Sequence, residues 1–260
     1  MDANSLLVNR FKAQCNKFSG NIARGLGKTK RRLIRELVYG IQASKDVKLS
    51  NISRSLQESI ALIKTENRLS RNLNDEDFTG HINTELLRLA DDKITAEMVI
   101  AIDPGDIMKP YAKAMEHLCK VYDGSEHVHA NGYHLCQVTA ANLEHNKIVP
   151  LYSEAYSSEE KDFAGTTQKI KRIVSRVKAS IGTISTWAID RQGDNAELIE
   201  HFVTEQLQFV TRLKLNRYLH LKRNLVAQVQ AENILRHVRL LHRATIMKIE
   251  NGSEKFFELV

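Results

Sequence analysis

Apolar side chains recur at helical spacing through the first 90 residues of the chain. The stretches that show this pattern are 5–20, 28–43, 49–56, 60–73 and 78–90. A spacing of three and four residues places such side chains on one face of an α-helix. Only three polar residues separate the third and fourth stretches. The pattern therefore predicts an all-α region that includes a helix, a short turn and a second helix.

After about residue 95 the pattern changes to short apolar runs bounded by turn residues. Val99 to Asp103 is rich in β-branched residues and precedes Pro104-Gly105, so we predict a buried strand that ends at Asp103. A similar run, 184–190, also ends on an aspartate, Asp190. Further strands are expected at 132–140, 147–152 and 207–213, with helices at 158–180 and 196–203. This order predicts a mixed α/β sheet.

The two aspartates are candidates for shared chemistry. A carboxylate at the end of a buried strand is held by a rigid element and still reaches solvent. If the two strands belong to one sheet, Asp103 and Asp190 would hold a divalent metal between them. Residues 214–260 allow two interpretations, because 224–242 fits one helix or two strands.

Charge is distributed unevenly along the chain. Residues 1–72 carry 15 Lys and Arg against 5 Asp and Glu, residues 73–204 carry 13 against 21, and residues 205–260 carry 10 against 5. Basic ends around an acidic middle suggest surfaces that grip a polyanion beside a centre rich in carboxylates. The chain has no apolar run long enough to span a membrane and only three scattered cysteines. We expect a soluble protein of the cytoplasm.

The fourth helical stretch carries the clearest candidate for nucleic-acid binding. Lys64, Asn67, Arg68 and Arg71 fall on one side of it, and these side chains suit phosphates and base edges. The alternative interpretation is an ordinary solvated basic helix. The excess of ten positive charges in residues 1–72 adds support to DNA binding, so that the two interpretations are evenly balanced.

The order of these pieces resembles the DDE transposases of bacterial insertion sequences. The matching stretches are IAIDPGDIMKPYAKAMEHLCKVYDGS (101–125), GYHLCQVTA (132–140), KIVPLYSEAYS (147–157), WAIDRQGDN (187–195) and FVTRLKLNR (209–217). The resemblance implies an α/β fold, with an RNase H-like mixed sheet and flanking helices behind an all-α, helix-turn-helix-like N-terminal domain. It also implies cleavage and strand transfer of phosphodiester bonds with Mg²⁺ or Mn²⁺.

In this resemblance Asp103 falls on the first acid of the family and Asp190 on the second. Asp106 and Asp194 lie close by in sequence, and supporting roles are expected for them rather than direct metal ligation. Arg212, Lys214 and Arg217 match a basic patch that faces DNA in relatives, with a solvated strand end as the alternative. The implied partner is double-stranded DNA, both the transposon ends and the target, bound by a homodimer in a bacterial cytoplasm at the nucleoid.

The family's third acid is a glutamate on a helix, within an aromatic-x-x-Glu-x-x-x-Lys/Arg pattern, and no such pattern follows Arg217. We therefore expect the N-terminal part of a transposase. The predicted domains are a helical DNA-binding domain (1–95), a catalytic core with two acids (96–217) and the start of an insertion (218–260). The alternatives are an inactive DNA-binding remnant or regulator of transposition, and a metal-dependent nuclease unrelated to transposition.

Overall fold

The computed structural model describes residues 3–74, 77–124, 127–142 and 144–212, and as backbone alone 218–221, 228–230, 244–250 and 253–259. The chain divides into two compact units, Met1–Leu89 and Ala90–Val260. Within the described residues, no helix has the length and apolar content that a membrane crossing requires. Cys15, Cys119 and Cys136 are buried free thiols.

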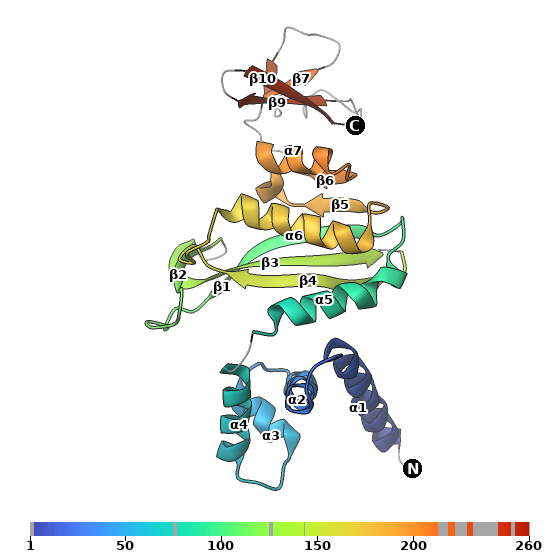
Figure 1. Ribbon diagram of the computed structural model, residues 1–260, viewed down its shortest axis with the longest axis vertical. Helices are drawn as coiled ribbons and strands as arrows, with labels where there is room; N and C mark the ends of the chain where they lie inside the picture. Colours follow the sequence, from blue (N-terminus) through green and yellow to red (C-terminus); the bar gives the residue numbers. More distant parts are fainter. Residues whose placement is uncertain are drawn as a thin grey trace. The chain divides into compact units, whose positions relative to one another are not determined.

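The first unit is helical, as the periodic stretches predict (Figure 1). Its helices are α1 (Ala3–Ile22), α2 (Lys28–Ser44), α3 (Leu49–Leu56), α4 (Leu62–Asn74) and α5 (Thr79–Ala90). Leu33, Ile52 and Leu69, from α2, α3 and α4, form one buried cluster, so these three helices pack together. Gly40 lets α2 approach α3 closely, because a Cβ at this position would clash with the side chain of Ile52.

The second unit is built on a six-stranded mixed sheet. Its strands are β1 (Val99–Met108), β2 (Cys119–Asp123), β3 (Val128–Asn142), β4 (Lys147–Tyr156), β5 (Thr186–Ile189) and β6 (Phe209–Thr211). The hydrogen-bonded order is β2-β3-β1-β5-β6, and the sixth strand, β4, also pairs with β3. β1 runs antiparallel to β3 and parallel to β5, and β5 runs parallel to β6.

Two helices connect the last strands of this sheet. α6 (Thr166–Ile181) joins β4 to β5, and α7 (Ala196–Thr204) joins β5 to β6. α6 lies along the sheet (Figure 1) and buries Ile170, Ile173, Val174, Val177 and Ile181. Ile100, Ile102, Trp187 and Ile189 are also buried. Parallel strands with helices between them bury such runs of apolar residues.

Two short 3-10 turns and a second sheet complete the unit. The turns are η1 (Asp91–Lys93) and η2 (Arg191–Gly193). The second sheet has the order β10-β9-β7-β8. Its strands are β7 (Tyr218–Leu221), β8 (Gln228–Gln230), β9 (Ala244–Glu250) and β10 (Ser253–Leu259). Within the stretch 224–242, which fits one helix or two strands, Gln228–Gln230 is extended. The other residues of this stretch lie outside the described residues.

The prediction that the first strand ends at Asp103 is wrong. β1 continues through Pro104 and Gly105 to Met108, paired with β3 along all ten residues. β5 pairs with β1 only as far as Ile102, so β1 has an unpaired edge on that side from Asp103 onward. Proline, which lacks an N–H donor, is tolerated on such an edge. The Pro-Gly pair is therefore not a turn. It lies where β1 continues with one of its two edges unpaired.

Candidate functional site

The register between β1 and β5 brings Asp103 and Asp190 to the same level of the sheet. Ile102 is paired with Ile189 in the parallel ladder. Asp103 follows Ile102 on β1, and Asp190 follows Ile189 directly after the end of β5, so the two aspartates come next after a pair of residues on neighbouring strands. Neighbouring strands lie about 4.8 Å apart. The two carboxylates that sequence analysis singled out are therefore neighbours across strands.

Both aspartates lie on the less covered face of the sheet. Side chains alternate between the two faces of a strand. Ile100 and Ile102 are buried, whereas Ala101 and Asp103 are exposed, and Asp190 is exposed after buried Ile189. Gln137, the β3 partner of Asp103 in the antiparallel register, is exposed as well. Sequence analysis missed Gln137, although an exposed amide beside a carboxylate adds an oxygen ligand or a donor to this face.

The backbone around Asp190 is fixed by a tight turn. Its Oδ1 accepts a hydrogen bond from the Gln192 N–H at 2.9 Å, and its carbonyl oxygen accepts one from Thr211 Oγ1 at 3.1 Å. A Cβ at Gly193 would clash with the Ile189 side chain and lie 2.9 Å from Thr211 Oγ1. Glycine at this position lets the chain turn closely behind the carboxylate and holds it at the end of β5.

Within the described residues, no ion pair engages Asp103 or Asp190. Two neighbouring carboxylates without a protein cation form an oxygen-rich negative site, which is the donor chemistry that Mg²⁺ and Mn²⁺ select. The residues present therefore fit a divalent cation. In the described part of the chain, no group of three or more His, Cys, Asp or Glu side chains gathers at one metal-binding position.

Of the two acids expected to support the site, Asp106 lies on the other face of the sheet, and the supporting role of Asp194 stays a prediction. Asp106 is three residues beyond Asp103 on the same strand, which places it on the opposite face, and its Oδ1 lies 2.7 Å from His134 Nδ1. The continuation of β1 beyond Asp103 causes this separation. Asp194 follows η2 and is only 3% exposed. Direct support of Asp103 by Asp106 is therefore excluded by the strand geometry.

A second cluster of charges lies on the face covered by α6. Glu154 of β4 accepts hydrogen bonds from Tyr152 Oη at 2.7 Å and Lys169 Nζ at 3.1 Å, and it pairs with Arg172. Burial alone would raise the pKa of Glu154, but the hydrogen bonds from Tyr152 and Lys169, together with the charges of Lys169 and Arg172, hold it below its usual value. This cluster joins β4 to α6.

Cys136 lies between the two sets of acids. It pairs with Pro104 on one side and with Glu154 on the other. Burial, followed by the charges of Glu154 and Asp103, raises the pKa of the Cys136 thiol to about 12. At neutral pH the Cys136 thiol is therefore protonated, which makes it a poor nucleophile.

The candidate nucleic-acid residues of α4 fall into two groups. Lys64, Asn67 and Arg71 are exposed and share one side of the helix. Arg68 is different, because its guanidinium binds Glu36 at 2.5 Å and Glu58 at 2.8 Å. The inclusion of Arg68 in a phosphate-contacting set is thus corrected: the fold of α2 against α4 uses its charge internally.

The internal network around Arg68 also includes Arg32, which binds Glu36 at 2.6 Å and Glu58 at 2.7 Å. The Thr65 hydroxyl donates a hydrogen bond to Glu58 at 2.7 Å and, despite the opposing effect of burial, lowers the pKa of Glu58 together with Arg68. The network bridges α2, α4 and the turn between α3 and α4. Sequence spacing gives no sign of it, since its members are up to 36 residues apart.

The remaining candidates lie at the end of β6. Arg212 is exposed directly after that strand. Lys214 and Arg217 lie outside the described residues. The structure therefore supports a solvent-accessible cation at Arg212 and leaves the other two as predictions.

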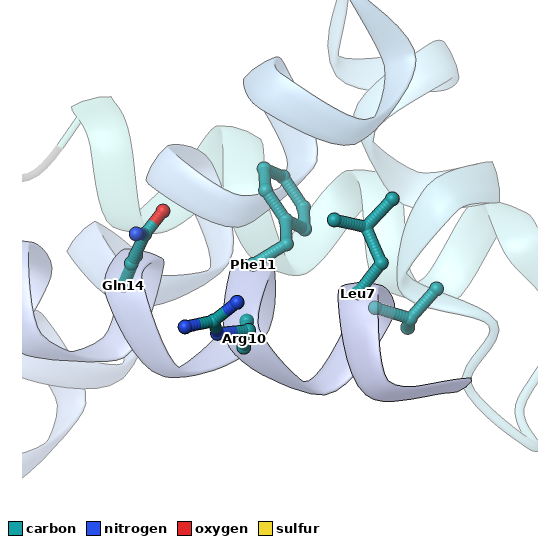
Figure 2. Close-up of a pocket in the computed structure, with 5 residues that line it drawn as sticks. Leu7, Arg10, Phe11 and Gln14 are labelled. Atoms are coloured by element: carbon teal, nitrogen blue, oxygen red, sulfur yellow. The ribbon is translucent and has the colours of Figure 1, made fainter. Parts of the chain in front are cut away.

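The first turns of α1 present an apolar surface. Leu6, Leu7 and Val8 are exposed by 48–68% of their area. Figure 2 shows Leu7, Phe11 and Gln14 following one another along the helix, with Arg10 beside them, around a groove of about 680 Å³. An exposed apolar run of this kind marks a surface for contact rather than a site for chemistry.

Comparison with known proteins gives one result of note. No protein-family model matches the chain, and no curated protein matches it in sequence. Among solved structures, the piggyBac transposase in a synaptic complex with hairpin DNA is similar over 88% of this chain and 48% of that one, at 11% identity and a TM-score of 0.46. The chain thus spans about half the length of that protein. A likeness at this level assigns neither a family nor an activity.

Proposed function

We propose that this chain is part of a DNA transposase with an RNase H-like core, and that Asp103 and Asp190 form its metal-binding pair. The observation that carries the proposal is the parallel register Ile102 to Ile189, which sets the two aspartates side by side on the less covered face of the sheet. The pair was proposed from two separate apolar runs 87 residues apart, and nothing in the sequence required those runs to become neighbours.

The strand order supports the same proposal. The sheet reads β4-β3-β1-β5-β6, with the first three strands of this path antiparallel and the last three parallel. In this order Asp103 lies on the central strand β1 and Asp190 directly follows the parallel neighbour β5, an arrangement compatible with the RNase H-like core that the resemblance implies. Of the five stretches that resemble DDE transposases, the first overlaps β1 and β2, and the other four overlap β3, β4, β5 and β6 in turn.

The residues divide the work of such a reaction. Asp103 and Asp190 would hold Mg²⁺ or Mn²⁺, which when bound supplies charge stabilisation at a phosphate and makes water or a 3′-hydroxyl more acidic. Lys64, Asn67 and Arg71 would contact the phosphates and bases of a DNA end, and Arg212 would neutralise phosphate charge near the sheet. Each unit is proposed to hold DNA through its own surface. Pairing of two copies on DNA stays a prediction.

The test is Mn²⁺ binding by the full 260-residue chain, measured by electron paramagnetic resonance or calorimetry. We expect a site that is lost in Asp103→Asn and in Asp190→Asn, because each variant replaces one of the two negatively charged ligands with a neutral amide. Asp106→Asn is the matched control, since Asp106 lies on the opposite face and is paired with His134. Survival of the site in the double Asp103→Asn/Asp190→Asn variant would overturn the proposal.

DNA cleavage provides the second measurement. Nicking of supercoiled plasmid by the wild-type chain in Mn²⁺, abolished by Asp190→Asn, would show that these residues suffice for chemistry. If the wild-type chain binds duplex DNA but no Mn²⁺, the catalytic proposal fails, and a DNA-binding protein without chemistry is the function that remains.

A further inference from the structure

A basic groove runs between α1 and α2 of the helical unit. It has a volume of about 550 Å³, and four cations of α2 line it: Lys28, Arg31, Arg32 and Arg35. Its α1 side consists of small side chains, including Ser19 and Gly20. The candidate residues from sequence analysis lie on α4 and after β6, so none of them belongs to this groove.

Within the described part of the chain, three of the four cations form no ion pair with a carboxylate. Lys28, Arg31 and Arg35 are exposed, and among the described residues no ion pair engages them. Arg32 is held by Glu36 and Glu58. The sequence of α1 from Ala3 to Ile22 contains no Asp or Glu, so the opposite wall supplies no negative charge. The groove therefore carries uncompensated positive charge.

The cations are arranged in a line. Lys28, Arg31 and Arg35 are spaced by three and four residues, which places them on one side of α2. At 1.5 Å per residue, the line from Lys28 to Arg35 extends about 10 Å. A smaller cavity of about 220 Å³ shares Asn16 and Arg35 with the groove and adds Lys12, whose Nζ lies 5.9 Å from the centre of the Tyr39 ring. A further cation, Lys12 of α1, thus lines the same cavity as Arg35, and the acid that lines that cavity, Glu36, is paired with Arg32 and Arg68.

We propose that the groove between α1 and α2 binds the phosphate backbone of one strand of duplex DNA. Phosphates on one strand advance about 3.4 Å along the helix axis, so a line of about 10 Å that runs parallel to this axis covers about three such steps. The groove would anchor DNA without reading its sequence, in addition to the surface of Lys64, Asn67 and Arg71 on α4. This inference rests on the proposed function in one respect, which is that DNA is the ligand.

The open wall at Gly20 supports the proposal and offers a way to test it. A Cβ at Gly20 would meet no atom within 4 Å, so a side chain can start there without a clash. Gly20→Glu would place a carboxylate opposite the cations, and Gly20→Ala would add only a methyl group and favour the helix. We expect weaker duplex binding for Gly20→Glu and unchanged binding for Gly20→Ala.

The decisive measurement is the salt dependence of duplex binding by the full chain, followed by fluorescence anisotropy. We expect Arg31→Gln/Arg35→Gln to reduce the slope of log K against log salt by about 1.8, because each lost phosphate contact contributes about 0.9. The control is Lys113→Gln/Lys120→Gln, which removes two exposed cations of the second unit and changes the net charge equally. Circular dichroism checks that each variant keeps its helices.

The outcomes separate this inference from the proposed function. An unchanged slope in Arg31→Gln/Arg35→Gln, or an equal loss in the Lys113/Lys120 control, would overturn the groove as a phosphate site and leave Mn²⁺ binding at Asp103 and Asp190 untouched. A reduced slope in a chain that binds no Mn²⁺ would support the groove while the catalytic proposal fails. Loss of single-stranded RNA binding alone would identify another ligand and overturn the inference.

Discussion

The two faces of the central sheet surround their carboxylates in opposite ways. Under α6, Glu154 receives a hydrogen bond from Tyr152 and the charges of Lys169 and Arg172. On the less covered face, Asp103 and Asp190 lie next to each other, and within the described part of the chain no side-chain cation pairs with either. The charge of Glu154 is compensated by cations of the protein itself. The two neighbouring aspartates have no such cation, so their negative charge can bind an external one.

The helical unit shows the same contrast with the opposite sign of charge. Arg68 and Arg32 form ion pairs with Glu36 and Glu58 within the unit. Among the residues that the structure describes, no carboxylate pairs with Lys28, Arg31 or Arg35, and these three cations line a groove. In both units, the groups left without a counter-charge are the ones available for a ligand. The predictions below test this division.

The largest expected effect comes from removing Glu154. Glu154→Ala leaves Lys169 without its main partner under α6, and we expect the free energy of unfolding to fall by about 2 to 3 kcal/mol, less than for a fully buried pair because Arg172 is 61% exposed. Urea unfolding followed through Trp187, the only tryptophan in the sequence and 1% exposed, measures it. Exposed Glu159→Ala is the control, and an equal loss there would contradict a special role for Glu154.

The next effect concerns the continuation of β1 beyond Asp103. A Cβ at Gly132 of β3 would clash with the Ile107 carbonyl oxygen and lie 2.7 Å from Val121 Cγ2, whereas a Cβ at Gly105 would meet nothing within 4 Å. We expect Gly132→Ala to lower stability by about 1 to 3 kcal/mol. Gly105→Ala should change it little. If the two variants lost equal stability in urea unfolding, β1 and β3 would not be packed in this register.

A smaller effect of opposite sign is expected at the pair of aspartates. Without divalent cations, Asp103→Asn should raise stability by about 0.2 to 0.5 kcal/mol, because it removes repulsion between neighbouring carboxylates. With millimolar Mn²⁺ the order should reverse, since only the wild-type chain gains free energy from metal binding. Thermal unfolding with and without Mn²⁺ measures both. A destabilised variant in metal-free buffer would indicate that Asp103 has a structural partner after all.

The smallest effect lies in the pH dependence of stability. The folded pKa of Glu154 lies below the usual 4.5, so its stabilising contribution is present above that pH and is lost as the pH falls through the folded pKa. The stability difference between wild type and Glu154→Gln should therefore shrink between pH 6 and pH 3. Urea unfolding at several pH values measures this difference. A constant difference would mean that the charge of Glu154 does not matter.

The sequence alone predicts the helices, the short strands and the aspartates that follow two of them, because each of these features depends on residues close together in the chain. Buried strands and amphipathic helices have local patterns, so all five helices of the first unit were predicted from spacing. Asp103 and Asp190 were selected for the same reason, as the polar residues at the ends of two such runs. The internal use of Arg68 was not readable, because its partners Glu36 and Glu58 lie on other parts of the fold.

The tertiary structure alone decided which charges are neutralised. The end of β5 at Ile189 leaves an edge on β1, and this edge explains why Pro104 and Gly105 continue a strand instead of turning it. The same continuation places Asp106 on the opposite face, where its Oδ1 lies 2.7 Å from His134 Nδ1. The sequence determined which groups can carry a charge. The pairing of strands and helices determined which of these charges have a counter-charge nearby, because a counter-charge acts over a few ångströms and not over positions in the chain.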